Sequence, residues 1–255
     1  MKTLKKIALI TGATSGIGKE TAILLSKNNF DLIICGRRND RLVEIEKNLA
    51  GNGSKVYFKS FDIRDKNEVD DFFKTLPDEW KNIDVLLNNA GLASGLSSFA
   101  DGEIDDWEKM IDTNVKGLLY ISKHVIPLMT EKKSGHIINI GSIAGKEIYP
   151  YGNVYCATKF AVDALTKAMR RELAEKNIKV TGIYPGAVET EFSLVRFKGN
   201  KEKASKVYEG YENLVANDIA QAVFWSINRP DHVNINEIVI MPQAQPAAGI
   251  IVKNQ

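Results

Sequence analysis

Short apolar runs recur along this chain and alternate with longer segments of helical periodicity. Runs rich in Val, Ile and Leu predict strands at residues 7–10, 32–35, 56–58, 85–87, 137–140, 180–183 and 238–240. Because these runs are continuous rather than alternating, each strand is expected to be covered on both faces. The alternation with helices predicts one α/β domain over residues 1–255, a Rossmann-type, doubly wound parallel sheet of about seven strands with helices on both faces.

One helical pattern, from residue 104 to residue 129, contains a polar residue in its apolar stripe. Trp107, Ile111 and Leu118 share that stripe, and Asn114 falls in the same line. A buried amide needs hydrogen-bond partners. Periodicity favours a structural amide satisfied by neighbouring backbone, and an amide that holds a proton-relaying water is the alternative. A less regular segment near residues 190–215 is the expected insertion, and we expect it to cover the substrate.

Composition narrows the choice of partners and of compartment. The net charge is only +2, with 26% charged residues of both signs, which argues against a nucleic-acid or membrane-surface partner and favours a small molecule. No apolar run approaches the ~20 residues of a membrane span. Cys35 and Cys156 both lie in apolar or helical segments, as expected of unpaired buried thiols in a reducing, cytoplasmic compartment. The three histidines lack metal-ligand spacing, so no metal site is expected.

A glycine-rich turn follows the first predicted strand and leads into a helix. Glycines in such a turn let backbone amides approach a pyrophosphate, although the spacing G-x-x-x-G-x-G differs from the commoner G-x-G-x-x-G and a tight turn is the alternative. The candidate phosphate-binding residues are Gly12, Thr14, Ser15, Gly16, Ile17 and Gly18.

The next strands end in charged residues that bear on cofactor choice. The second strand is followed by Arg37 and Arg38, where NAD-preferring folds place an acid. Two guanidiniums would bind a 2′-phosphate, which predicts NADP, unless they merely solvate a loop. After the third strand, Asp62 and Ile63 could contact the adenine, or Asp62 could cap the helix that begins near Asp65.

Small and polar residues also follow the fourth, fifth and sixth strands. Any of them could form a simple turn or instead face a ligand at the carboxyl edge of the sheet. A hydroxyl such as Ser142 would suit hydrogen bonding to a substrate oxygen, since no histidine is placed to make it a nucleophile. The candidates are Asn89, Ala90 and Gly91, then Ser142, and then Pro185, Gly186, Val188 and Thr190.

Tyr155 and Lys159 stand four residues apart in a predicted helix, so both side chains emerge from one face. A tyrosine ionises near pH ~10, and an adjacent ammonium lowers that pKa by favouring the phenolate. Such a pair could move a proton to or from an alcohol or carbonyl oxygen. An ordinary helix contact is the alternative for the pair taken alone.

Together these motifs, in this order, resemble the short-chain dehydrogenase/reductase family over essentially the whole chain. The resemblance implies that Tyr155 exchanges the hydroxyl proton, Ser142 binds the same oxygen, Lys159 also holds the nicotinamide ribose, and Asn114 anchors a water. The segment 191–199, the tail after residue 236 and the paired arginines resemble the branch of NADP-dependent 3-hydroxy acid and serine dehydrogenases, usually cytoplasmic tetramers. Arg196 is the candidate partner for a substrate carboxylate.

The resemblance therefore implies an NADP-dependent oxidoreductase acting on a small 3-hydroxy acid or a β-hydroxy amino acid such as serine. A broad-specificity NADPH-dependent carbonyl or ketoacyl reductase is the enzymatic alternative. A non-catalytic NADP sensor on the same fold is disfavoured because Ser142, Tyr155 and Lys159 are all present.

Overall fold

Seven parallel strands form the centre of the protein in a computed structural model that describes residues 5–253. Their order in the sheet is β3-β2-β1-β4-β5-β6-β9, and every neighbouring pair is parallel. Each predicted apolar run lies inside one of these strands, so the predicted sheet is confirmed. Their bounds are β1 Lys6–Thr11, β2 Phe30–Gly36, β3 Val56–Ser60, β4 Ile83–Asn88, β5 Gly135–Ile140, β6 Ile178–Pro185 and β9 Glu237–Ile240.

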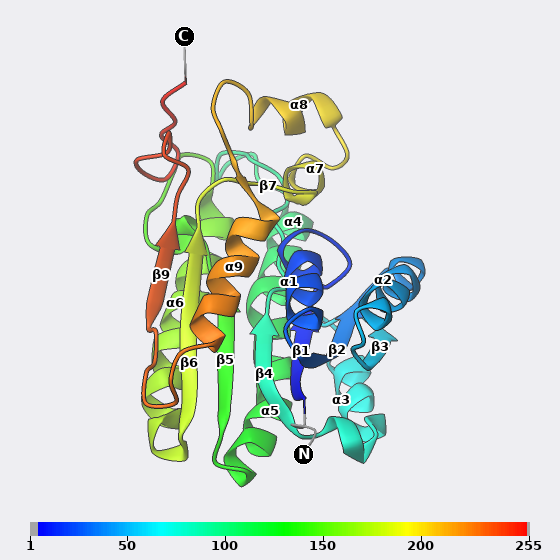
Figure 1. The fold of residues 1–255 in the computed structure, drawn as a ribbon. Helices are drawn as coiled ribbons and strands as arrows, with labels where there is room; N and C mark the ends of the chain where they lie inside the picture. Colours follow the sequence, from blue (N-terminus) through cyan, green and yellow to red (C-terminus); the bar gives the residue numbers. More distant parts are fainter. Residues whose placement is uncertain (1–4, 254–255) are drawn as a thin grey trace.

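Helices cover both faces of the sheet (Figure 1). One face packs against α1 (Gly16–Ser26), α2 (Asn39–Gly51) and α9 (Ala216–Ile227). The other packs against α3 (Lys66–Thr75), α5 (Leu118–Glu131) and α6 (Asn153–Leu173). Short 3-10 turns occupy Asp78–Trp80, Ile143–Gly145 and Ala174–Lys176. Within the described residues, no helix has the length and apolar character needed to cross a bilayer.

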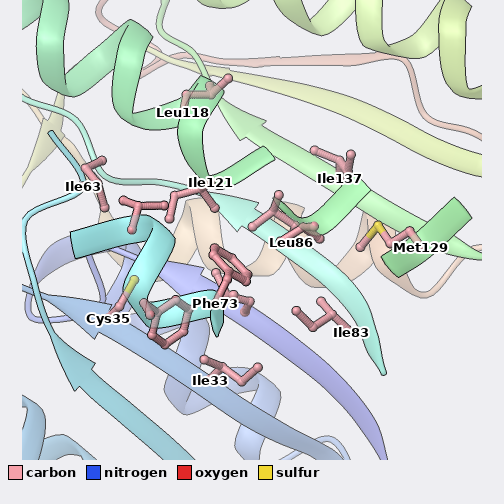
Figure 2. Close-up of a cluster of buried hydrophobic side chains, with 14 of the residues drawn as sticks. Ile33, Cys35, Ile63, Phe73, Ile83, Leu86, Leu118, Ile121, Met129 and Ile137 are labelled. Carbon is pink, nitrogen blue, oxygen red and sulfur yellow. The ribbon is translucent and has the colours of Figure 1, made fainter. Parts of the chain in front are cut away.

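The strands supply side chains to two cores because successive residues point to opposite faces. Ile33, Leu86 and Ile137 pack with α3 and α5 residues such as Phe73 and Ile121, as Figure 2 shows. The intervening strand residues join the core under α1, α2 and α9, and include Ile34, Leu87 and Ile138. Burial on both faces explains why the strands read as continuous apolar runs rather than alternating ones.

The predicted long helix is interrupted by one wider turn. α4 (Ile104–Ile111) passes into a π-helical turn over Asp112–Gly117, which continues into α5. The predicted apolar stripe is wrong here, because Ile111 is 41% exposed while Asn114 and Leu118 are buried. A π-turn adds a residue to the helical repeat, so positions before and after it no longer share one face.

The segment expected to be irregular contains short regular elements. β7 (Val188–Glu189) pairs with β8 (Leu214–Val215) as a small parallel sheet, and α7 (Phe192–Arg196) and α8 (Lys201–Lys206) lie between them. Figure 1 shows α7 and α8 beyond the carboxyl ends of the central strands. The segment is thus less regular than the rest of the chain, with turns between these short elements, and it stands apart from the seven-stranded sheet.

The order of the strands fixes where a ligand can enter. Successive strands add on one side from β1 to β3 and on the other side from β4 onward, so the order reverses between β1 and β4. Such a switch point opens a crevice at the carboxyl edge of a parallel sheet. The Asn89 side chain spans this point, where its amide donates to Thr11 O at 2.8 Å and to Gly12 O at 3.2 Å.

Candidate active site

A cavity of about 320 Å³ opens at this crevice. The structure brings together in its lining most of the residues proposed from the sequence, namely Gly12, Thr14, Ser15, Gly16, Ile17, Arg37, Arg38, Asp62, Ile63, Asn89, Ala90, Gly91, Ser142, Tyr155, Lys159, Pro185, Gly186, Val188 and Thr190. Gly18, Asn114 and Arg196 lie outside the lining, and each contacts a residue of the site or its supporting loops.

The glycine-rich turn presents bare backbone to the cavity. Gly12 and Gly16 have φ angles of +66° and +53°, which favour glycine. Gly18 lies beneath the turn, where a Cβ atom would stand 2.5 Å from Gly12 O. The Ser15 hydroxyl does not cap α1 and accepts a hydrogen bond from Arg38 instead. The first-turn amides of α1 therefore face the cavity without a side-chain partner, as a phosphate site requires.

The two arginines after β2 differ in how many hydrogen bonds and ion pairs they already make within the protein. Arg38 donates to Thr14 Oγ1 and Ser15 Oγ, both at 2.8 Å, and to Glu191 Oε2 at 2.7 Å. Arg37 is 57% exposed, and its guanidinium lies 4.0 Å from the Asp62 carboxylate. Both guanidiniums line the cavity beyond the end of β2. Arg37 is thus the more open cation, while Arg38 is held against the glycine-rich turn.

Asp62 does not cap α3. Asp65 is the cap, and its carboxylate accepts from Asn67 N at 2.8 Å and Glu68 N at 3.2 Å. Burial alone would raise the pKa of Asp62, but the hydrogen bonds and charge of Arg64 hold that pKa below its ordinary value. Asp62 is therefore an ionised acceptor at the edge of the cavity, beside Ile63.

Asn114 lies in the π-turn, and its amide nitrogen and amide oxygen are both hydrogen-bonded to the protein. Its Oδ1 accepts from Leu92 N at 2.8 Å, and its Nδ2 donates to Leu92 O at 2.8 Å and to Thr158 Oγ1 at 3.0 Å. These bonds tie the chain after β4 to α6. A Cβ atom on Gly91 would stand 3.2 Å from Asn114 Oδ1 and 3.4 Å from Lys159 Nζ. The side chain therefore has the structural role that periodicity favoured, and π-turns commonly mark functional sites.

Tyr155 and Lys159 project from the first turns of α6 toward the end of β5. Both are buried, with 8% and 6% of their surface exposed. Lys159 Nζ donates to Ile140 O at 3.0 Å. Ser142, two residues beyond Ile140, faces the Tyr155 hydroxyl, and its Oγ accepts from Ala144 N at 3.1 Å. A phenol, a hydroxyl and an ammonium thus meet at one end of the cavity.

Burial opposes ionisation of both groups. Burial raises the pKa of Tyr155 above its ordinary value, and Arg196 and Ser142 act in the lowering direction. Burial also lowers the pKa of Lys159 from 10.5 to about 8. We expected Lys159 to supply the charge that lowers the tyrosine pKa. In this structure Arg196 also acts in that direction, since its guanidinium carbon lies 4.9 Å from the centre of the Tyr155 ring, and Lys159 Nζ lies 6.0 Å from the same centre.

Arg196 is the last residue of α7 and approaches Tyr155 from that helix. Its guanidinium lies over the rings of Tyr155 and Phe192, and it donates to the Tyr149 hydroxyl at 2.8 Å. Its buried Nε has no hydrogen-bond partner among the described residues. The backbone is fixed, since Arg196 O accepts from Gly95 N at 2.9 Å. Arg196 can therefore offer an unused donor to an anion next to the tyrosine.

Sequence reasoning missed Glu191 and Phe192, which are among the further residues of the cavity lining, and Arg41, which pairs with Glu191. Glu191 accepts from Arg38 and from Arg41, each at 2.7 Å. Arg41 follows Arg38 by three positions at the start of α2, a helical spacing that could have suggested a shared face. No sequence signal joined either arginine to a residue about 150 positions later. Burial would raise the pKa of Glu191, but its hydrogen bonds to Arg38 and Arg41 lower that pKa to about 2.

Because the Lys159 ammonium is buried, we expect a substitution that removes its charge to stabilise the cofactor-free protein. Below a pH of about 8, Lys159 is charged in the folded protein, and the burial of that charge lowers the free energy of unfolding. Between pH values of about 8 and 10.5, Lys159 is neutral in the folded protein but still charged in the unfolded chain, so the destabilisation diminishes as the pH rises. Lys159→Met should therefore stabilise the cofactor-free protein by about 1–3 kcal/mol at about pH 7, with most of that gain lost by about pH 10. Urea unfolding of both proteins at the two pH values measures this, and a variant less stable than wild type at neutral pH would contradict it.

Comparison with known proteins agrees with this geometry. The family model described as short chain dehydrogenase matches residues 6–201. The chain is 45% identical over 247 residues to the NADP-dependent 3-hydroxy acid dehydrogenase YdfG of Salmonella typhi, covering 96% of this chain and 98% of that protein. It is 44% identical over 250 residues to the protein of the same name from Escherichia coli K12, covering 98% and 100%.

A solved structure described as the closed form of serine dehydrogenase complexed with NADP+ superimposes with a TM-score of 0.92. Its sequence is 44% identical, and the match covers 98% of this chain and 100% of that one. The family match, the near full-length relatives and the shared fold agree with one another. This chain belongs to the short-chain dehydrogenase family.

Proposed function

We propose that this chain transfers a hydride between NADP(H) and the carbinol carbon of a small 3-hydroxy acid or a β-hydroxy amino acid such as serine. The observation that carries the proposal is that the Tyr155 phenol and the Ser142 hydroxyl meet at one end of the cavity, with the Arg196 guanidinium over the Tyr155 ring just outside the cavity lining. The near full-length relatives named 3-hydroxy acid dehydrogenase, and the serine dehydrogenase structure, support the same chemistry.

The cavity fits NADP along its length. The turn at Gly12, Gly16 and Ile17 offers uncapped amides for the pyrophosphate. Arg37 and Arg38 stand where the 2′-phosphate would lie, and no acid follows β2 directly to favour a plain ribose hydroxyl. When bound, the nicotinamide supplies the hydride acceptor or donor. Thr14 and Ser15 are assigned to the phosphates with the rest of the glycine-rich turn, which Gly18 supports. The remaining lining is assigned to the adenine (Asp62 and Ile63) and to the riboses and nicotinamide (Asn89, Ala90, Gly91, Pro185, Gly186, Val188 and Thr190).

The chain's own residues move the proton. In the oxidation direction, the substrate O–H and the carbinol C–H bonds break, and a carbonyl forms. Tyr155 takes the hydroxyl proton while Ser142 donates a hydrogen bond to the same oxygen. Lys159 holds the nicotinamide ribose, and its charge, added to that of Arg196, favours the phenolate. Asn114 positions Gly91 and α6 around Lys159, and a water near this π-turn would relay the proton to solvent.

The substrate end of the cavity is suited to a carboxylate. Arg196 presents its unpartnered Nε beside Tyr155, at the end of a segment that we propose covers the substrate. Lys198, the competing cation, is already paired with the buried Asp106 at 2.8 Å. Arg196 is therefore the group that binds the substrate carboxylate and places its 3-hydroxyl near Tyr155 and Ser142.

We also infer a homotetramer that works in the cytoplasm. Ala157, Ala164 and Ala168 are exposed on the outer side of α6, so this small-residue stripe does not pack inside the domain. Phe160, on the same helix, is 40% exposed. Both cysteines are buried and unpaired, which fits a reducing compartment.

Tyr155→Phe tests the proton step. The substitution keeps the ring that packs against Phe192, so the fold and the NADP site are expected to persist. Turnover of 3-hydroxypropanoate or L-serine should fall about 1,000-fold or more, because the variant has no group to accept the hydroxyl proton. Calorimetry should show NADP+ affinity within about twofold of wild type. Near-normal turnover would overturn the role of Tyr155.

Arg196→Gln tests the substrate class. The loss of a charge-assisted hydrogen bond should raise the KM for a 3-hydroxy acid by about 10- to 100-fold. The methyl ester of the same acid is the matched control, because it lacks the carboxylate charge, and its kcat/KM should change far less. Equal losses for acid and ester would refute carboxylate recognition by Arg196 and would favour a broad-specificity carbonyl reductase.

A further inference from the structure

Three charged side chains meet where the glycine-rich turn approaches α7. Glu191, directly before α7, accepts from Arg38 Nη1 and from Arg41 Nη1, each at 2.7 Å. All three side chains are between 37% and 39% exposed. We refer to them as the Arg38–Glu191–Arg41 cluster. It connects the arginine proposed for the 2′-phosphate to the segment proposed to cover the substrate.

Arg38 has little capacity left for another anion. Its Nε and Nη2 donate to the Thr14 hydroxyl, its Nη2 also donates to Ser15, and its Nη1 donates to Glu191. A guanidinium has five N–H groups in all, so one remains free. Bidentate binding of a phosphate needs two donors in parallel. A 2′-phosphate must therefore displace one of the present partners of Arg38 to be held fully.

Glu191 is the partner that a phosphate would displace. The phosphate and the carboxylate are both anions, and they would repel each other across a shared guanidinium. The phosphate has close to two negative charges near neutral pH, against one on the carboxylate. Glu191 would still be paired with Arg41 after its ion pair with Arg38 is broken, so its carboxylate would not be left without a cation. The hydroxyls of Thr14 and Ser15 are neutral and carry no such repulsion.

We propose that Glu191 competes with the cofactor 2′-phosphate for Arg38, and thereby sets how strongly the site prefers NADP over NAD. This inference rests on the proposed NADP site. Glu191 is a specificity residue that weakens phosphate binding, and Arg37, the more exposed cation, provides the first contact for the phosphate. When the phosphate replaces Glu191 on Arg38, the start of α7 loses its contact with Arg38 and keeps its contact with Arg41. Arg196 lies at the other end of this helix.

The test measures binding of adenosine 2′,5′-bisphosphate and of 5′-AMP, which differ only in the 2′-phosphate, by calorimetry without turnover. Glu191→Gln should tighten binding of the bisphosphate about five- to tenfold and change 5′-AMP binding by less than about twofold. Glu189→Gln is the matched control, because it removes the same charge from an exposed side chain two residues away. Its effect on either ligand should be small.

A double-mutant cycle separates competition from simple charge removal. In an Arg38→Gln background, Glu191→Gln should lose most of its effect on the bisphosphate, because no shared guanidinium remains. Weaker bisphosphate binding by Glu191→Gln would overturn the inference and show that Glu191 orients Arg38 for the phosphate. An equal gain for both ligands, or for Glu189→Gln, would also overturn it. Wild-type protein that binds both ligands equally would instead contradict the NADP site itself.

Discussion

The burial of the Lys159 ammonium is the constraint on which the rest of the site depends. Its donated hydrogen bond goes to Ile140 O, and among residues 5–253 it has no carboxylate partner. A buried cation with spare donors is costly, as its lowered pKa shows. Ribose hydroxyls of a bound cofactor would satisfy those donors. The fold holds Lys159 ready for this partner, through the π-turn at Asn114 and the close approach of Gly91.

The other cations lie where anionic groups are expected. Arg37 and Arg38 follow β2 and line the cavity, and Arg196 lies outside the lining, over the ring of Tyr155. Glu191, which pairs with Arg38, directly precedes α7, and Arg196 is the last residue of that helix. The groups proposed to bind the substrate carboxylate and the cofactor 2′-phosphate therefore belong to α7 or contact the residue before it. This arrangement explains why a small net charge coexists with a strongly cationic site.

The sequence predicted the sheet because each strand is buried on both faces and reads as an apolar run. It predicted the cofactor edge because ligands bind beyond the carboxyl ends of such strands, which placed residues as distant as Gly12 and Thr190 in one cavity. The π-turn could not be foreseen, since it depends on hydrogen bonds that Asn114 makes to Leu92 and Thr158. The pairing of Glu191 with Arg38 and Arg41 depends on tertiary contacts between distant segments, and local patterns carry no information about these.

Transfer of a hydride from the carbinol carbon to NADP+ can be followed with 3-hydroxypropanoate that carries deuterium at the carbinol carbon. The substrate is incubated with the protein and NADP+, and the nucleotide is examined by mass spectrometry. We expect the reduced nucleotide to contain deuterium from the substrate, because hydride transfer is direct. Reduced nucleotide without deuterium, or no reduction with any small 3-hydroxy acid or serine, would contradict it.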